Sequence, residues 1–384
     1  MRFLHTADWH VGKSLKGHQR LDEQERVLRE IVRTAREHEV DAVLVAGDLY
    51  DSAAPTAAAQ KLVVRTLLGL AQAGIEVVAI AGNHDHAATL DAYRPLAGAS
   101  GITLVGTPRS AGQGGVVEFT ARSTGQPVTV ALLPFVSQRF AVRAAEIVAN
   151  TPGENTAAYD RDLRQILTTL TSGFRTDAVN LVMAHLTVLN GAFGGGERMA
   201  QSIFEYAVPA SVFPVDAHYV ALGHLHRRQR MEAACPVHYS GAPLAVDFGE
   251  QENTPVVCLV EAAPGTPAQV TDLPLTGGRR LRTVQGTLHD LAQVDAGDDF
   301  LRVLVREQAR AGLRDDVLQL LPNALEVRID PEFAAPLTPT RPRSAGARER
   351  HPSELFAEYL AATKIADPRV EALFARLHDE TAQS

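Results

Sequence analysis

Cysteine is scarce in this sequence, because Cys235 and Cys258 are the only two among 384 residues. Two cysteines exclude a disulfide framework and exclude the paired cysteine patterns that hold structural zinc. We interpret both as small buried apolar residues, since free cysteine packs well in protein cores. The sequence therefore predicts a reducing, cytoplasmic setting.

Long apolar runs are also missing. Apolar stretches such as residues 42–46 and 77–81 have the length of a strand, whereas a bilayer span needs about 20 apolar residues. Polar residues follow Met1 within a few positions, so we expect no signal peptide and no transit sequence. The sequence predicts a protein without membrane association.

An excess of basic charge is absent as well. Lys and Arg total 37 against 45 Asp and Glu, which gives a net charge of −8. This balance argues against a protein that holds nucleic acid by bulk electrostatics alone. It leaves a nuclease open, because metal ions and local basic side chains can carry the phosphate contacts.

The first third of the chain alternates strand and helix patterns. Apolar strand-like runs occupy residues 2–6, 42–46 and 76–81, and helical periodicity occupies residues 22–39 and 56–73. Strand–helix–strand order with short apolar strands is typical of βαβ units with a parallel sheet.

The middle of the chain is richer in strands. A helix is predicted at residues 160–172, and the predicted strands lie at 116–120, 128–133, 179–184, 219–222, 237–240 and 256–261. The stretch 262–267 is rich in Pro, Gly and Ala and is interpreted as a turn or short linker. Together these patterns predict an α/β fold with a two-sheet sandwich over residues 1–275.

The last hundred residues divide into three predicted parts. Residues 276–337 contain three strand patterns and one helix pattern, which predicts a small separate α/β module. Residues 338–350 are rich in Pro and Arg and predict a basic linker. Residues 351–384 predict two short amphipathic helices, at Ser353–Ala362 and Pro368–His378. Their apolar faces either fold back on the body of the protein or dock a partner.

Five polar clusters each come directly after an apolar, β-branched run. They are Asp8-Trp9-His10, Gly47-Asp48-Leu49-Tyr50-Asp51, Gly82-Asn83-His84-Asp85, Ala184-His185 and Gly223-His224-Leu225-His226. So many imidazoles and carboxylates are costly to bury without a common partner. Carboxylate, carboxamide and imidazole groups at converging strand ends are suited to a pair of divalent metal ions.

Each cluster has a simpler explanation when taken alone. A single histidine at a strand end is usually a surface or core residue, and a Gly-Asp pair is usually a turn. Five such clusters in succession, each at a predicted strand end, favour the metal site over five independent turns.

The order of these clusters resembles that of the calcineurin-like metallophosphoesterase superfamily. Within it, residues 5–12, 221–227 and 239–244 make the chain similar to the SbcD family of bacterial nucleases. The resemblance is strong over residues 1–250 and looser beyond. It implies a metallophosphoesterase sandwich over 1–275, a DNA-capping domain over 276–337, and partner-binding helices over 351–384.

The resemblance also implies a set of ligands and catalytic residues. Metal one would be held by Asp8, His10, Asp48 and His226, and metal two by Asp48, Asn83, His185 and His224. Manganese is the expected ion, with magnesium as the alternative. His84 would contact the scissile phosphate and protonate the leaving oxygen, and Asp51 would orient His84. Asp85 is interpreted as a turn cap or a support for the ligands.

The function implied is that of a Mn²⁺-dependent DNA nuclease. The family combines 3′-to-5′ exonuclease activity on double strands with endonuclease activity on single strands and hairpins, and its C-terminal helices bind an SbcC-type ATPase. The resemblance further implies a homodimer through the helix at 56–73 and the stretch 90–96; burial of the same apolar residues within one chain is the simpler explanation. Two alternatives stay open: a metallophosphodiesterase or phosphatase acting on nucleotides or phosphoproteins, and a scaffold with a decayed site.

Three further features have two interpretations each. Trp9, the only tryptophan, is expected to form a core wall behind the metals, or else a platform for base stacking. The basic loop 13–20 would grip DNA phosphates or lie solvated at the surface. Gly194-Gly195-Gly196 lacks the context of a phosphate-binding turn and is expected to be a flexible loop.

Overall fold

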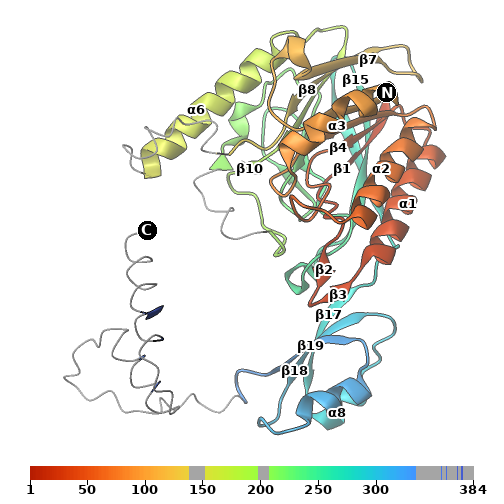
Figure 1. The fold of residues 1–384 in the computed structure, drawn as a ribbon. Helices are drawn as coiled ribbons and strands as arrows, with labels where there is room; N and C mark the ends of the chain where they lie inside the picture. Colours follow the sequence, from red (N-terminus) through yellow and green to blue (C-terminus); the bar gives the residue numbers. More distant parts are fainter. Residues whose placement is uncertain are drawn as a thin grey trace. The chain divides into compact units, whose positions relative to one another are not determined.

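The computed structural model describes residues 1–137, 152–197 and 207–333, together with residues 356, 360, 370, 373 and 374 (Figure 1). It divides into two compact units, Met1–Glu332 and Phe333–Ser384. The predicted linker 338–350 and most of the two predicted C-terminal helices lie outside the described residues. Among the helices that are described, none is long and apolar enough to cross a membrane.

The first sheet has the strand order β16-β15-β1-β4-β5-β6. Its strands are β1 (Arg2–Thr6), β4 (Ala42–Val45), β5 (Glu76–Ile80), β6 (Ile102–Val105), β15 (Val256–Ala263) and β16 (Thr266–Pro274). The run β1-β4-β5-β6 is parallel, and β15 joins β1 in antiparallel register. The βαβ prediction for the first third of the chain is therefore confirmed.

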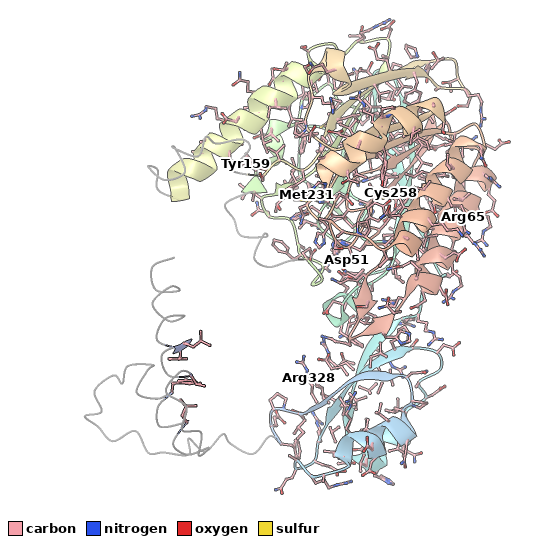
Figure 2. All side chains as sticks on the ribbon, in the orientation of Figure 1. Asp51, Arg65, Tyr159, Met231, Cys258 and Arg328 are labelled. Atoms are coloured by element: carbon pink, nitrogen blue, oxygen red, sulfur yellow. The ribbon has the colours of Figure 1, made fainter. Side chains whose placement is uncertain are left out.

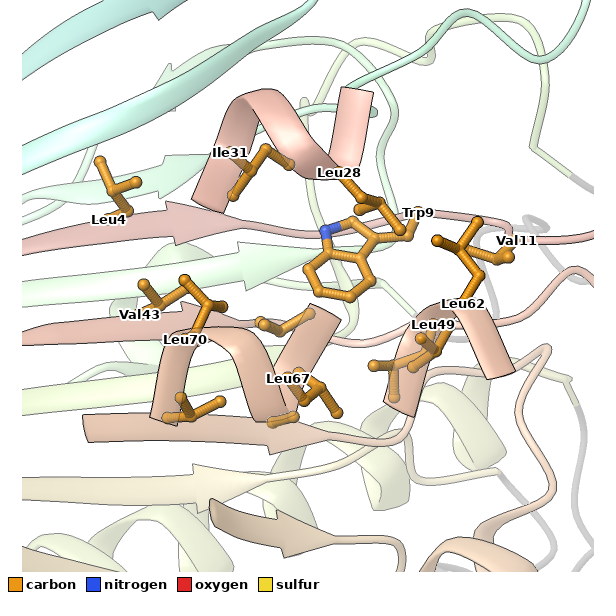
Figure 3. Packing of buried hydrophobic residues seen from close by; sticks show 14 of the residues in the cluster. Leu4, Trp9, Val11, Leu28, Ile31, Val43, Leu49, Leu62, Leu67 and Leu70 are labelled. Atoms are coloured by element: carbon orange, nitrogen blue, oxygen red, sulfur yellow. The ribbon is translucent and has the colours of Figure 1, made fainter. Parts of the chain in front are cut away.

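Three helices pack beside this sheet: α1 (Leu21–Glu37), α2 (Ala57–Ala71) and α3 (Ala87–Ala99) (Figure 1). Helix α2 begins after Thr56, whose side chain accepts a hydrogen bond from the Ala59 N–H and caps the helix. Figure 3 shows Trp9 packed among the leucine and isoleucine side chains of α1 and α2. Trp9 is 2% exposed, so the prediction of a core wall is confirmed.

The second sheet has the order β13-β14-β12-β9-β8-β7. Its strands are β7 (Val116–Thr120), β8 (Pro127–Leu133), β9 (Val179–His185), β12 (Tyr219–Gly223), β13 (Gln229–Met231) and β14 (Val237–Tyr239), and helix α6 (Pro152–Thr171) packs on β8. One fully buried cluster joins the two sheets and contains Phe3 and Leu44 of the first and Val130 and Met183 of the second. The predicted two-sheet α/β sandwich is confirmed.

A three-stranded parallel sheet follows the sandwich in the chain. It consists of β17 (Leu281–Gly286), β18 (Phe300–Val305) and β19 (Ala324–Ile329), with α7 (Leu288–Leu291) and α8 (Leu313–Leu320). Its buried cluster includes Leu301, Val303 and Val317. We refer to residues 281–329 as the α/β module. The domain boundary at 275/276 stays a prediction.

Several short elements complete the described chain. They are β2 (Ser14–Leu15), β3 (His18–Gln19), β10 (Thr187–Val188), β11 (Ala207–Val208) and the 3₁₀ turns η1 (Ala111–Gln113), η3 (Ala210–Val212) and η4 (Phe248–Glu250). Strands β2 and β3 form a hairpin just after the first polar cluster. This hairpin and η4 both contact the α/β module.

Strand β16 and the start of helix α6 are two of the places where the structure differs from the sequence prediction. The stretch 262–267 holds the tight turn of the β15–β16 hairpin, and β16 itself was missed. Strand β16 lies at the sheet edge with most side chains exposed or half-buried, so it lacks an apolar pattern. Helix α6 begins at Pro152 instead of residue 160, because proline is well tolerated in the first helical turn.

Candidate metal centre

The five polar clusters meet at one edge of the sandwich. Strands β1, β4 and β5 are neighbours in the first sheet, and β9 and β12 are neighbours in the second. Each polar cluster follows the carboxyl end of one of these strands or begins in its last residues. In open α/β sheets this edge is where ligands bind. All seven predicted ligands come from these five strand ends.

Four predicted ligands have a left-handed backbone. The φ angles are 54° at Asp8, 44° at His10, 50° at Asp48 and 104° at His224. Such conformations cost about 1–3 kcal/mol each for residues other than glycine and cluster at functional sites. The Asp8 and His10 N–H groups donate to Gly47 O and Asp48 O, both at 3.0 Å. These bonds hold the first two ligand loops against each other.

Two glycines are required by close approach to the ligands. A Cβ atom on Gly47 would overlap the His185 ring, and one on Gly82 would overlap the Asp48 carboxylate. Gly47 also has a φ of 95°, which L-residues with side chains rarely adopt. The Gly-Asp and Gly-Asn patterns of the sequence thus have a steric cause.

The atoms predicted for metal one lie close together. Asp8, His10 and His226 each offer one atom, and the three atoms lie within 4.8 Å of one another. The Nε2 atoms of His10 and His226 are 3.0 Å apart. Asp8 Oδ1 accepts from the His224 N–H at 2.9 Å, whereas its buried Oδ2 has no hydrogen-bond partner among the described residues. An unpaired buried carboxylate oxygen is the group that a cation would satisfy.

The atoms predicted for metal two gather around Asn83. Its Oδ1 lies 3.0 Å from His185 Nε2 and 2.9 Å from His224 Nδ1. Asp48 Oδ2 lies 3.5 Å from His185 Nε2 and 3.7 Å from His10 Nε2. Asp48 therefore stands between the two groups of ligands, where a bridging carboxylate would stand.

Two of the predicted ligand histidines are oriented by acceptors at Nδ1. His185 Nδ1 lies 2.8 Å from Ala46 O, and His226 Nδ1 lies 2.5 Å from Glu250 Oε1. A hydrogen bond at Nδ1 leaves Nε2 free to bind a metal. Sequence reasoning missed Glu250, which lies in the 3₁₀ turn η4 and shares no spacing with the ligand motifs.

Burial and charge shift the pKa values in the site. Burial raises the pKa of Asp8 to about 7 and lowers the pKa of His224 to about 3. Burial also acts against protonation of His226 and His185, yet Glu250 and Asp48 outweigh it and raise both pKa values to about 9. The carboxylates of the site thus favour positive charge at His185 and His226.

Taken together, the donor set fits a pair of divalent cations. Two carboxylates and four imidazoles are buried here, and the half-buried Asn83 adds a carboxamide oxygen within 3.0 Å of two of the imidazoles. Such mixed oxygen and nitrogen sets are typical of first-row divalent ions. The individual ligand assignments stay predictions.

His84 lies beside this site, and its Nδ1 contacts the main chain of Asp51. His84 Nδ1 is 2.7 Å from the Asp51 carbonyl oxygen and 3.9 Å from the Asp51 carboxylate. The Asp51 carboxylate is 3.1 Å from Lys13 Nζ. Asp51 is labelled among the side chains in Figure 2. The catalytic role of His84 and the orienting role of Asp51 stay predictions.

Asp85 supports the turn that carries the ligands. Its carboxylate accepts from the N–H groups of Gly82, Leu49 and Tyr50, at 2.9, 3.2 and 3.0 Å. Burial, followed by the nearby Asp48 charge, raises the pKa of Asp85 to about 7. Asp85 joins the β4 and β5 ligand loops, as expected of a turn cap.

The basic loop 13–20 and the glycine loop have structural contacts. Arg20 is 2% exposed, donates to Glu23 at 2.7 Å and lies over the Phe300 ring of the α/β module. Arg20 is therefore unavailable for DNA phosphates. It is also not solvated at the surface, so neither of the two predictions for loop 13–20 holds for this residue. The Gly194 and Gly195 N–H groups donate hydrogen bonds to the Glu197 carboxylate at 2.6 and 2.7 Å. These bonds hold the glycine loop, which was predicted to be flexible, in one conformation.

Residues 1–228 match the family described as calcineurin-like phosphoesterase. The chain is 37% identical over 306 residues to the SbcD component of the nuclease SbcCD from Bacillus subtilis, covering 78% of this chain and 76% of that one. The chain belongs to the SbcD family. The Rhodobacter capsulatus SbcD protein is 33% identical over 383 residues, with 92% and 91% covered. The Escherichia coli K12 SbcD protein is 31% identical over 306 residues, with 77% and 73% covered.

Family membership settles the class of chemistry. A calcineurin-like phosphoesterase of the SbcD family is a metal-dependent phosphodiester hydrolase, and its family binds divalent metals. The buried groups of Asp and His side chains described above are where this chain can hold them.

Proposed function

We propose that this chain is a Mn²⁺-dependent DNA nuclease that acts with an SbcC-type ATPase in DNA repair and recombination. Its activities would be a 3′-to-5′ exonuclease on double strands and an endonuclease on single strands and hairpins. The observation that carries the proposal is the convergence of all seven predicted ligands in a chain whose relatives are named as the SbcD component of the nuclease SbcCD.

The side chains of the site would have different roles in phosphodiester hydrolysis. When bound, two divalent cations would supply positive charge at the phosphate and promote ionisation of water. Asp48 would hold both ions in place, because its carboxylate lies between the two groups of ligands. His84, held at Nδ1 by the Asp51 carbonyl, would donate a proton to the leaving ribose oxygen.

Manganese is the proposed ion because of the donor chemistry. Asp8, Asp48 and Asn83 offer oxygen atoms, whereas the four histidines offer nitrogen. Magnesium and calcium prefer oxygen ligands throughout, and imidazole shifts the preference towards manganese, iron or zinc. Magnesium is the alternative ion for the loaded enzyme.

DNA is the proposed substrate because the site adjoins a second folded element. The hairpin β2–β3, which follows the ligand His10, packs its His18 ring on Phe300 of the α/β module, with ring centroids 4.9 Å apart. Arg227, directly after the ligand His226, is exposed and can contact a phosphate. A module beside the site suits a polymer more than a small phosphoester.

Cleavage assays on labelled DNA test this proposal. End-labelled duplex and hairpin DNA are incubated with Mn²⁺ and the full chain, with and without an SbcC-type ATPase. The wild type should cut both substrates, and His84→Gln should lose about 10²- to 10⁴-fold in rate. The matched control is His86→Gln, which changes an exposed histidine two residues away and should keep wild-type rates.

The alternative function is that of a metallophosphodiesterase or phosphatase on nucleotides or phosphoproteins. The predicted ligand set supports this alternative equally well, because bound metal ions would contact only the phosphate group, which all these substrates share. Rapid hydrolysis of bis-p-nitrophenyl phosphate without cleavage of any DNA substrate would favour this alternative over the nuclease.

We further propose that the C-terminal segment 351–384 binds the SbcC-type ATPase. The relatives are named as components of an SbcCD nuclease, which supports a two-component assembly. Phe356 and Phe374, two described residues of this segment, stack with ring centroids 4.1 Å apart. Deletion from Arg341 onward should abolish co-elution with the ATPase in gel filtration and leave hydrolysis of bis-p-nitrophenyl phosphate intact; retained co-elution would refute this role.

We also propose a homodimer through the outer face of α2 and α3. Leu62, Val63, Leu67 and Leu70 are buried in the chain's own core, so they do not support a dimer. Other apolar side chains of these helices are exposed and adjoin a cavity of about 320 Å³; they are Val64, Tyr93 and Leu96. An exposed apolar face of this kind is typical of association surfaces.

The cytoplasm is the proposed setting of the enzyme. Cys235 and Cys258 are both free and buried. Burial raises the pKa of the Cys235 thiol to about 11 and that of Cys258 to about 12, so both stay protonated and unreactive. Free thiols of this kind suit a reducing compartment.

A further inference from the structure

A short segment, residues 247–251, lies between the metal centre and the α/β module. Its Glu250 is 1% exposed, and both of its carboxylate oxygens are engaged. Oε1 accepts from His226 Nδ1 at 2.5 Å, and Oε2 accepts from the Val246 N–H at 2.7 Å. Glu250 therefore fixes both the orientation of the His226 ring and the nitrogen that carries the proton.

The same segment is anchored to the α/β module on its other side. Phe248 is 1% exposed and belongs to a buried cluster with Leu281 and Phe300 of the module. The Arg302 guanidinium lies 4.8 Å from the centre of the Phe248 ring. Gln251 Oε1 accepts from the Thr283 N–H of β17 at 2.9 Å. Residues 247–251 thus touch a metal ligand and the module within one short turn.

The backbone around Glu250 leaves little room for adjustment. Gly195 and Gly249 approach so closely that a Cβ on either would meet the other's main chain. Glu197, next to that glycine loop, accepts from the His226 N–H at 2.9 Å. A shift of residues 247–251 would consequently displace the His226 ring, its main chain, or both.

We propose that Glu250 is a positioning residue for the metal ligand His226, and that residues 247–251 transmit the position of the α/β module to the metal centre. The proposal rests on the proposed metal site and substrate. It assigns to the module a role in metal retention in addition to any contact with DNA. When the module contacts Phe248 and Gln251, His226 Nε2 keeps the orientation needed to bind the ion. When the module moves away from these two residues, His226 would lose that orientation and the ion would bind more weakly.

Manganese titration of the full chain tests the role of Glu250. Free Mn²⁺ is counted by electron paramagnetic resonance while the ion is added to wild type and to Glu250→Gln. The variant should bind one of the two ions about 10- to 100-fold more weakly, the range typical when a ligand loses its supporting carboxylate. Glu252→Gln, the same change at an exposed neighbour, should bind as wild type does. Equal affinities in all three proteins would overturn the proposal.

Gln251→Ala tests the link to the module. Gln251 does not touch His226, and its side chain bonds the module at Thr283. Loss of this bond should weaken the same Mn²⁺ site about 2- to 10-fold, as expected for one hydrogen bond. Gln293→Ala, at an exposed glutamine of the module, serves as the control and should have no effect. An unchanged Mn²⁺ titration for Gln251→Ala would refute the transmission.

A spectroscopic measurement on the wild type needs no variant that might fold poorly. The chain is labelled with ¹⁵N-histidine, loaded with diamagnetic Zn²⁺, and the ring nitrogens are observed by NMR. His226 should carry its proton on Nδ1, and a proton on Nε2 would contradict the role of Glu250. Failure of the nuclease proposal can be distinguished from failure of the Glu250 proposal. In the first case DNA is not cleaved, but Mn²⁺ still binds and the variants still change its affinity as expected.

Discussion

His10 and His226 face each other with their Nε2 atoms 3.0 Å apart, although 216 residues separate them in the chain. Burial holds the pKa of His10 well below its usual range, whereas Glu250 raises the pKa of His226 to about 9. His226 is therefore the more basic of two imidazoles that lie within hydrogen-bond distance of each other. A cation bound at this site would have to exchange with the proton of His226.

This exchange predicts that metal binding depends on pH. Below about pH 9 the raised pKa values keep His185 and His226 protonated, so a cation must displace their protons. Mn²⁺ affinity should therefore fall steadily on acidification from about pH 9 to about pH 6. Calorimetric titrations in buffers of different ionisation enthalpy should record proton release on binding. The control variant His289→Gln, at an exposed histidine of α7, should release the same number of protons as the wild type. Constant Mn²⁺ affinity across this pH range would refute the exchange.

Asp85 should contribute to stability through the turn that it caps. Asp85→Ala leaves three buried N–H groups without an acceptor, which should lower the free energy of unfolding by about 2–4 kcal/mol. Asp85→Asn keeps one acceptor oxygen and should lose about half as much. Urea unfolding at unchanged m-value measures both.

The control for Asp85 is Asp22→Ala. Asp22 is an exposed carboxylate in the first turn of α1, so its loss should change the free energy of unfolding by less than about 1 kcal/mol. If Asp85→Ala unfolded at the same urea concentration as Asp22→Ala, the capping role would be disproved.

The convergence of the predicted ligands could be predicted from sequence, because each lies at or just after the end of a buried strand. Strand patterns and adjacent polar residues are local features, and parallel strands bring their ends together without further information. Glu197 and Glu250 were not predictable in this way. Glu197 reaches His226 from a loop and Glu250 from the 3₁₀ turn η4, and the position of both segments depends on tertiary packing, including the contact of Gly195 with Gly249.

The sequence also could not show whether the apolar residues of a helix are buried in the chain's own core or in an interface with a second copy. Leu67 and Leu96 are equally apolar, yet Leu67 is 6% exposed and Leu96 is 73% exposed. Helical periodicity gives a face, but it does not tell whether the chain itself or a second copy covers that face. The same holds for Arg20, which looks like a phosphate contact in sequence and is a buried ion pair with Glu23 in the fold.

The proposed dimer predicts a clear change in mass. Leu96→Glu combined with Val64→Glu places two charges on the exposed face of α2 and α3 and should give a monomer in sedimentation velocity. Neither residue is in the core, since Val64 is 46% exposed, so the variant should fold as wild type does. Leu320→Glu, at a 40% exposed leucine of α8, should leave the mass unchanged. A double variant with wild-type mass would rule out this interface.

The contact between His84 and Asp51 predicts a graded effect on catalysis. Because the Asp51 carbonyl, at 2.7 Å, is nearer to His84 Nδ1 than the carboxylate at 3.9 Å, removal of the side chain should leave the ring oriented. Asp51→Ala should therefore lower kcat by roughly tenfold at most, about 1.4 kcal/mol, through loss of the negative charge near His10 and Lys13. His84→Gln should lower kcat far more at unchanged Mn²⁺ affinity. Equal losses in the two variants, measured at saturating Mn²⁺ on duplex DNA, would show that the carboxylate orients His84 in the working enzyme.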